Sequence, residues 1–147
     1  MGASRNSSCC WETVNTPIHI CYTAVCPETG ETYSLILPYA NSDSMSIFLE
    51  ELSEHYSQNR IIMVMDNASW HSAKSMPGIQ NIRPLFLPPR APELNPVECI
   101  WHHIKERHFS NRVLKSINDV EQRLVTALAE LNQEKPKIRK MTYFNCL

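Results

Sequence analysis

The sequence predicts an α/β fold in which a mixed sheet is flanked by helices. Two β-prone runs lie close together near the start of the chain, and the continuous apolar run Ile61–Met65 has the character of an inner strand. Several other stretches repeat apolar residues at the 3.6-residue period of a helix. With 147 residues, 43% apolar and 20% charged, the chain is long enough for one globular domain with a sizeable core.

The first part of the chain predicts a hairpin. Residues 1–17 are polar and turn-rich, and we expect an irregular N-terminal segment there. Two β-prone runs follow at 19–26 and 32–37, joined by a five-residue loop that contains Pro27 and Gly30. Two such runs around a short loop of this kind are typical of antiparallel strands.

A helix and an inner strand are expected next. Ser42 or Asp43 can cap a helix whose apolar positions follow the helical period. These positions are Met45, Phe48, Leu49, Leu52 and Tyr56. The strand Ile61–Met65 then has no polar residue on either face, which indicates the centre of a sheet with helices packed on both sides.

The second half predicts one more strand and two helices. After a short irregular piece with a short helix (67–78), Ile82–Leu87 reads as a strand that Pro88 ends. A helix begins at Pro96, and its apolar positions are Val97, Ile100, Trp101 and Ile104. A last helix begins near Ser116, with apolar positions Ile117, Val120, Leu124, Leu128 and Leu131. Residues 133–147 are expected to form a C-terminal tail.

Composition restricts the possible functions. The formal net charge of −1 excludes a polycation, so contacts with nucleic acid require local clustering of basic residues. Residues 28–54 contain no Lys or Arg, whereas the chain from Arg83 onward is basic. The longest apolar run is too short to span a membrane, and the N-terminus lacks the apolar core of a secretory signal. The six cysteines lack zinc-site spacing, and we expect a cytoplasmic protein.

Two carboxylates stand at positions suited to chemistry. Asp66 directly follows the inner strand, and Glu98 lies in the first turn of the helix that Asn95 caps. Each also has a purely structural interpretation. Asp66 can start a turn, and Glu98 can form a capping box with the helix N-terminus. A carboxylate at a strand end and one on a nearby helix can nevertheless hold divalent cations beside a phosphodiester.

The segments around these two acids carry a family resemblance. Met65-Asp66-Asn67-Ala68-Ser69-Trp70-His71 and the stretch from Phe86 to Trp101, with its Leu94-Asn95-Pro96-Val97-Glu98 core, resemble the catalytic domain of mariner-type DDE transposases. The likeness is greatest to the bacterial insertion-sequence branch. It extends from about Tyr22 to Leu131, and the second segment is the more specific of the two.

The resemblance implies an RNase H-like fold in which three carboxylates hold two Mg²⁺ or Mn²⁺ ions for DNA cleavage and strand transfer. Asp66 matches the second acid of that family and Glu98 the third. Glu93 is a rival for the third position, but it precedes the helix in a proline-bounded loop, where its side chain is less fixed. The implied partners are DNA at transposon ends and a second copy or a partner transposase chain.

The first acid of the family is missing from the sequence pattern. Before His19 the sole acid is Glu12, and no apolar run precedes it, so we do not assign Glu12 to that position. We therefore expect residues 18–132 to form a partial, N-terminally truncated RNase H-like domain without its first strand. Such a fragment is expected to be inactive alone. Arg90 also departs from the family, which usually has an aromatic residue there.

Other residues near the two acids are weaker candidates. Asn67, Trp70, His71 and Asn95 are possible neighbours of the site, and Arg90, Lys105, Arg107 and Arg112 are possible DNA contacts. For these basic residues a solvated surface is at least as good an explanation. His102 lies one helical turn after Glu98, and with His103 it is better explained as an exposed helix pair than as a metal ligand.

Two other functions compete with a transposase fragment. A non-catalytic module with the same fold would bind DNA or a partner transposase chain through an exposed sheet edge. An unrelated metal-dependent hydrolase would pair Asp66 with His71, but it leaves the Leu94–Glu98 segment unexplained.

Overall fold

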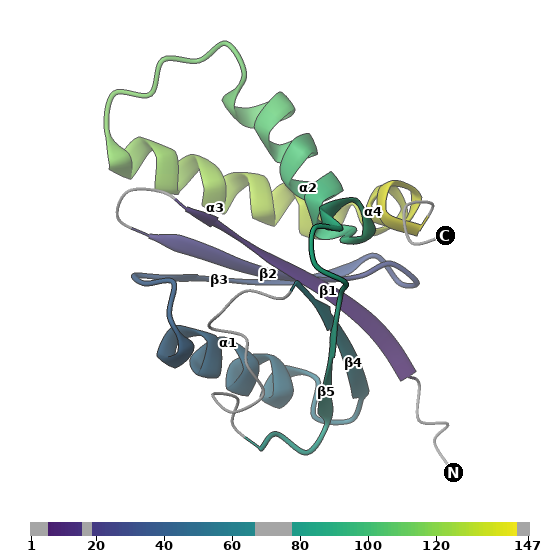
Figure 1. Ribbon diagram of the computed structural model, residues 1–147. Coiled ribbons are helices and arrows are strands. Elements are labelled where there is room, and N and C mark those ends of the chain that lie inside the picture. The colour runs from purple at the N-terminus through teal and green to yellow at the C-terminus, as the bar shows by residue number, and fades with distance from the viewer. Residues whose placement is uncertain (1–5, 16–18, 67–77, 144–147) are drawn as a thin grey trace.

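One five-stranded sheet organises the molecule (Figure 1). The structure is a computed structural model, and it describes residues 6–15, 19–66 and 78–143. The strands are β1 (Asn6–Asn15), β2 (Ile20–Cys26), β3 (Glu31–Leu37), β4 (Arg60–Met65) and β5 (Ile82–Phe86). Their order in the sheet is β3-β2-β1-β4-β5; β1 to β3 are antiparallel neighbours, and β1, β4 and β5 are parallel. This confirms the predicted mixed sheet.

The central strand differs from expectation. Residues 6–15 were predicted to be irregular and the first strand to be missing, but β1 occupies the middle of the sheet, so both predictions were wrong. On one side Cys10 pairs with Val25 of β2, and on the other it pairs with Val64 of β4. Backbone bonds of this kind do not depend on side-chain polarity, so a polar segment can join two strands that each need a neighbour.

The predicted hairpin is confirmed. β2 and β3 pair from Ile20 opposite Leu37 to Cys26 opposite Glu31. Gly30 closes the turn with φ +74°, and its N–H donates to the Cys26 carbonyl at 2.8 Å. A left-handed backbone of this kind favours glycine because a Cβ is crowded there.

Helices cover both faces of the sheet (Figure 1). The long ones are α1 (Ser42–His55), α2 (Val97–Ile104), α3 (Ile117–Gln133) and α4 (Lys135–Tyr143). A short 3-10 turn, η2 (Pro92–Leu94), precedes α2, and a π-helical turn, η3 (Lys105–Phe109), continues it. α1 lies alone below the sheet in Figure 1, whereas α2, α3 and α4 lie above it.

The first core lies between α1 and the sheet. Four predicted apolar positions of α1 are buried, namely Met45, Phe48, Leu49 and Leu52, whereas the fifth, Tyr56, follows the last helical residue and is partly buried. They pack with Ile61, Met63 and Met65 of β4 and with alternate residues of β2. The N-cap was predicted at Ser42 or Asp43, but it is Asn41. The Asn41 side chain accepts a hydrogen bond from the Ser44 N–H at 2.8 Å.

The second core lies between the other helices and the opposite face. The predicted positions of α2 (Val97, Ile100, Trp101 and Ile104) are all buried. They pack with Leu124, Ala127 and Leu131 of α3, with Ile138 of α4, and with Cys21 and Val25 of β2. α3 begins where predicted, with the Ser116 side chain accepting from the Asp119 N–H at 3.1 Å. Its predicted residue Ile117 remains exposed.

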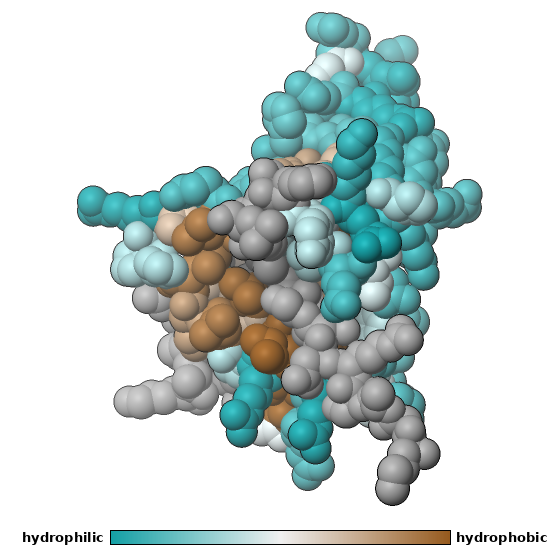
Figure 2. All heavy atoms as spheres, turned by 90° about the vertical axis from the view of Figure 1, so that its right-hand side faces the viewer, coloured by the Kyte–Doolittle hydropathy of each residue, from teal (hydrophilic) through white to brown (hydrophobic). Residues whose placement is uncertain are grey.

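β4 is less buried than predicted. Val64 packs against the second core, but Ile62 on the same face is 40% exposed, and Leu85 of β5 is 56% exposed. Figure 2 shows a hydrophobic area on the side of the molecule that carries β4 and β5. The helices above the sheet cover β2 more fully, and every residue of β2 is buried. The strand buried on both faces is therefore β2, not β4.

The C-terminal segment is part of the domain. Residues 133–147 were predicted as a tail, but residues 135–143 form α4, in which Ile138 and Thr142 are fully buried. Lys135 at its start lies against Gly30 of the hairpin turn and forms an ion pair with Glu31 at 3.4 Å. Lysines and arginines dominate this helix, so its narrow apolar stripe gives a weak sequence signal.

Candidate functional site

Asp66 lies where the chain leaves β4. The preceding residue, Met65, is buried in the first core, and Asp66 itself is exposed. The Leu87 N–H donates to the Met65 carbonyl at 2.7 Å, so the ladder between β4 and β5 continues up to this point. The carboxylate therefore sits at the carboxyl ends of two parallel strands. In open α/β sheets ligands commonly bind at this edge.

Glu98 lies in the first turn of α2 and is partly exposed. Asn95 has an extended backbone, and Pro96, with φ −66° and ψ −15°, is already helical. The Asn95 side chain accepts a hydrogen bond from the Val97 N–H at 3.2 Å, which confirms Asn95 as the cap of this helix end. Asn95 is 4% exposed, so the start of α2 is well anchored.

The capping-box interpretation of Glu98 is not supported. A capping box requires the Glu98 carboxylate to accept from the Asn95 N–H, but that N–H donates to the Pro92 carbonyl at 2.9 Å. Within the described part of the chain, the Glu98 side chain has no hydrogen bond or ion pair. Its carboxylate is thus left to a ligand or to water.

The residues that precede the two acids pack on the same face of the sheet. Val64, two residues before Asp66, packs against the cluster that contains Val97, the residue before Glu98. No group of three or more His, Cys, Asp or Glu side chains among the described residues is placed to hold a metal ion. The carboxylates predicted as ligands therefore do not form a complete metal site by themselves.

Glu12 of β1 is a third acid whose backbone position is related to that of Asp66. Cys10 of β1 pairs with Val64 of the parallel strand β4. Glu12 is two residues after Cys10, as Asp66 is two residues after Val64. This ladder ends at Cys10 and Val64, and extending it by two residues would bring the backbone of Glu12 level with that of Asp66. No apolar run precedes Glu12, so its sequence context argued against it, and its place in the sheet becomes apparent from the strand pairing.

Three predicted neighbours cannot be placed. Asn67, Trp70 and His71 lie outside the described residues.

The predicted DNA contacts separate into two groups. Arg107 and Arg112 line one open groove together with Lys115 and Arg123, two residues that sequence analysis missed. Arg90 and Lys105 are exposed and do not line it. Arg90 has φ +62°, a left-handed backbone that is uncommon for a residue with a side chain.

The histidines of α2 behave as predicted for a helix surface. His102 Nε2 lies 3.2 Å from Glu106 Oε1, and both side chains are exposed. Partial burial lowers the pKa of His103, and the charges of Lys137 and Arg107 lower it further. With Glu98 these residues border an open hollow of about 560 Å³ that reaches Met141 of α4.

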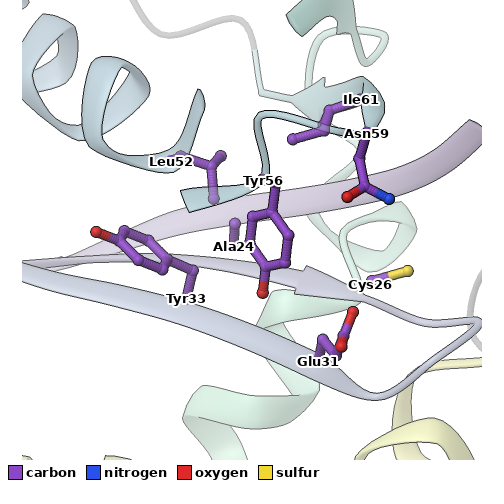
Figure 3. Close-up of a pocket in the computed structure, with 8 residues that line it drawn as sticks. All are labelled: Ala24, Cys26, Glu31, Tyr33, Leu52, Tyr56, Asn59 and Ile61. Carbon is purple, nitrogen blue, oxygen red and sulfur yellow. The ribbon is translucent and has the colours of Figure 1, made fainter. Parts of the chain in front are cut away.

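An enclosed pocket elsewhere is too small for a substrate. It lies between the end of α1 and the β2–β3 hairpin, and Tyr33, Tyr56 and Glu31 are among its lining residues (Figure 3). Its volume of about 20 Å³ holds about one water molecule. Among the described residues, no helix combines the length and the apolar character needed to cross a membrane.

Comparisons with known proteins agree with this arrangement. Residues 18–121 match the family described as DDE superfamily endonuclease. Over 100 residues the chain is 36% identical to "Uncharacterized protein y4pE/y4sA" of Sinorhizobium fredii, covering 67% of this chain and 74% of that protein.

Two solved structures share the fold. The catalytic core domain of BIV integrase aligns with a TM-score of 0.63 at 18% identity, over 87% of this chain and 84% of that chain. A chain from the simian T-cell lymphotropic virus intasome in complex with the PP2A regulatory subunit B56 gamma aligns with a TM-score of 0.57 at 12% identity, over 87% and 49% of the two chains. These neighbours confirm the RNase H-like fold. Because the family match spans most of the chain, this protein belongs to the DDE superfamily of endonucleases.

Proposed function

We propose that this chain is the catalytic domain of a mariner-type transposase of a bacterial insertion sequence, with DNA as its substrate. The observation that carries the proposal is the pair of acids within a DDE domain: Asp66 at the end of β4, and Glu98 at the start of α2 outside a capping box. The structural neighbours support it, since one is described as the catalytic core of an integrase and the other as part of an intasome.

Asp66 and Glu98 would hold Mg²⁺ or Mn²⁺. Both present carboxylate oxygens, which are the ligands these ions prefer, and both are accessible. The bound ions would supply charge stabilisation for displacement at a phosphodiester. The chain's own contribution is positioning: the Asn95 cap holds the first turn of α2, and the buried residue Met65 anchors the strand from which Asp66 projects.

Two acids alone give an incomplete site. We therefore expect weak binding of the metal and no DNA cleavage by the isolated chain. A second candidate rests on the register of β1, which favours Glu12 as a third ligand. Glutamate is one methylene longer than the aspartate of the family, so a site completed in this way would still differ from the family in geometry.

The decisive experiment is a calorimetric titration with Mn²⁺, combined with a plasmid-nicking assay. Asp66→Asn and Glu98→Gln should each abolish the residual binding, because each removes one anionic ligand. Glu93→Gln is the matched control, since Glu93 is exposed beside the same helix and should leave binding unchanged. Binding that survives both site variants would refute the proposal.

The Glu12→Gln variant distinguishes a site of two acids from a site that Glu12 completes. If Glu12 completes the site, wild-type protein will nick DNA in the presence of Mn²⁺ and Glu12→Gln will not. If the site has two acids, wild-type protein will not nick DNA, and Glu12→Gln will bind Mn²⁺ as well as wild type does.

The partners and the compartment follow as further proposals. Transposon-end DNA and a second copy of the chain, or a partner transposase chain, fit this function. Cys21 is a buried thiol, which fits a reducing compartment such as the cytoplasm. Burial raises the pKa of Cys21 to about 11, so this thiol is unreactive at neutral pH.

A non-catalytic module that binds DNA or a partner chain is the alternative. The exposed apolar residues Ile62 and Leu85 near the sheet edge favour it. In that case Mn²⁺ would not bind at all, whereas binding of DNA or of a transposase chain would persist in Asp66→Asn.

A further inference from the structure

An open groove lies at the far end of α2 from Glu98. It runs between η3, the connection 110–116 and α3, and its volume is about 720 Å³. In Figure 1 this connection lies at the top of the view, beyond the helices and away from α1. Four basic side chains line the groove against two carboxylates; they are Arg107, Arg112, Lys115 and Arg123, opposed by Asp119 and Glu130.

Two of the four basic side chains already have partners within the protein. Arg107 Nη1 lies 3.6 Å from Glu134 Oε1, and Arg123 Nη1 donates a hydrogen bond to the His108 carbonyl oxygen at 3.3 Å. Glu130 is in turn close to His108, at 3.6 Å. These contacts hold η3 against α3, so they shape the groove rather than leave charge for a ligand.

The other two cations are available. Arg112 and Lys115 are both exposed, and among the described residues neither forms a hydrogen bond or an ion pair. They stand on the connection just before the Ser116 cap, where the N-terminal end of α3 adds partial positive charge. This combination suits phosphate oxygens, which bind Lys, Arg and helix N-termini.

The helix fixes the spacing between this groove and the carboxylates. Arg107 follows Glu98 by nine positions (107 − 98) along the continuous rod formed by α2 and η3. At about 1.5 Å per residue, the two positions are separated by about 14 Å. That is about four base-pair steps of duplex DNA at 3.4 Å each.

We propose that this groove binds the sugar-phosphate backbone of the DNA duplex at least four base pairs from the phosphodiester at the carboxylate site. The proposal rests on the proposed function, because it takes that duplex as the substrate. The groove recognises charge and backbone shape and does not read base sequence. It would position the duplex against the carboxylates from outside the site.

The test compares two double charge reversals. Arg112→Glu with Lys115→Glu changes the groove, and Arg139→Glu with Lys140→Glu makes the same change at exposed positions of α4. Binding to a duplex of about three helical turns is measured without divalent ions, over a series of salt concentrations. Groove reversal should weaken binding at least tenfold and lower the slope of log K against log salt by about 1.8, whereas the control should lose no more than about threefold.

Three results would overturn the proposal: an equal loss in both variants, no loss in the groove variant, or no DNA binding by wild type. Stronger groove-dependent binding of an RNA duplex would overturn the assignment to DNA. The measurement is independent of the metal site, because Asp66→Asn should bind DNA as wild type does without divalent ions. Conversely, the groove variant should bind Mn²⁺ as wild type does. The proposed metal site and the proposed DNA-binding groove can therefore be refuted independently.

Discussion

Glu98 shows how one backbone hydrogen bond changes the interpretation of a side chain. Its position in the sequence suits a capping box as well as a metal ligand, because both roles need a carboxylate in the first helical turn. The 3-10 turn η2 resolves the choice by bringing the Pro92 carbonyl to the Asn95 N–H. Once that donor is occupied, the capping box is excluded, and the favourable interaction with the helix dipole is the structural role that remains.

Gly30 is a position at which a single added methyl group should be harmful. An alanine Cβ there would collide with the Lys135 carbonyl at the start of α4, and the backbone is left-handed. Gly30→Ala should therefore destabilise the protein by roughly 3 kcal/mol, combining about 1–2 for the backbone and about 1–3 for overpacking. Urea denaturation measures this difference.

Gly78→Ala is the matched control for that substitution. Gly78 is exposed, and a Cβ there would meet no atom within 4 Å. Its effect should stay within about 0.5 kcal/mol. Equal stability of the two variants would mean that α4 does not pack on the hairpin turn.

Among the helices, α2 links the fold to the chemistry. Its buried face carries the second core, and its first turn carries Glu98. Its continuation, η3, supplies Arg107 to the basic groove. A change at the start of this helix should therefore affect both stability and the metal site.

Asn95→Ala tests the anchoring of α2. Loss of the acceptor for the Val97 N–H should reduce the free energy of unfolding by about 1 kcal/mol and weaken Mn²⁺ binding, because the first turn frays. Asn95→Asp retains an acceptor and should recover most of the stability. Asn118→Ala, at an exposed position of α3, controls for loss of an asparagine and should change neither quantity. Unchanged stability in Asn95→Ala would show that the cap is dispensable.

In the domain as a whole, β1 connects the antiparallel strands β2 and β3 to the parallel strands β4 and β5. Residues 6–10 pair with β4 and residues 10–15 pair with β2, so each half of β1 is bonded to a neighbouring strand. We expect hydrogen exchange to be slow across residues 6–15 and Ile61–Met65 alike, since central strands open only with global unfolding. Mass spectrometry of peptides from both strands measures this.

An exchange pattern in which residues 6–15 exchange as fast as a denatured peptide, while β2 stays protected, would contradict the central position of β1. It would also remove the backbone register on which the assignment of Glu12 depends. In the sheet, β5 would then be the remaining strand paired with β4.

Most of the local structure was predictable from neighbouring residues. The hairpin and the buried faces of α1 and α2 follow from periodicity and from turn residues, which act over a few positions. Asp66 and Glu98 were found in the same way, because each stands at a recognisable strand or helix end. The cap of α1 was misplaced because Asn41, Ser42 and Asp43 are all good caps, and packing selects one of them.

The remaining features depend on contacts between distant parts of the chain. β1 is polar, and it is a strand because β2 and β4 offer backbone partners on both sides. Ile62 is exposed because the helices above the sheet cover Val64 of β4 but not Ile62, which no local pattern encodes. The basic groove likewise forms because α3 returns along α2 and brings Arg123 to Arg112. Short-range periodicity specifies each element, whereas long-range pairing specifies its neighbours, and the site arises from both.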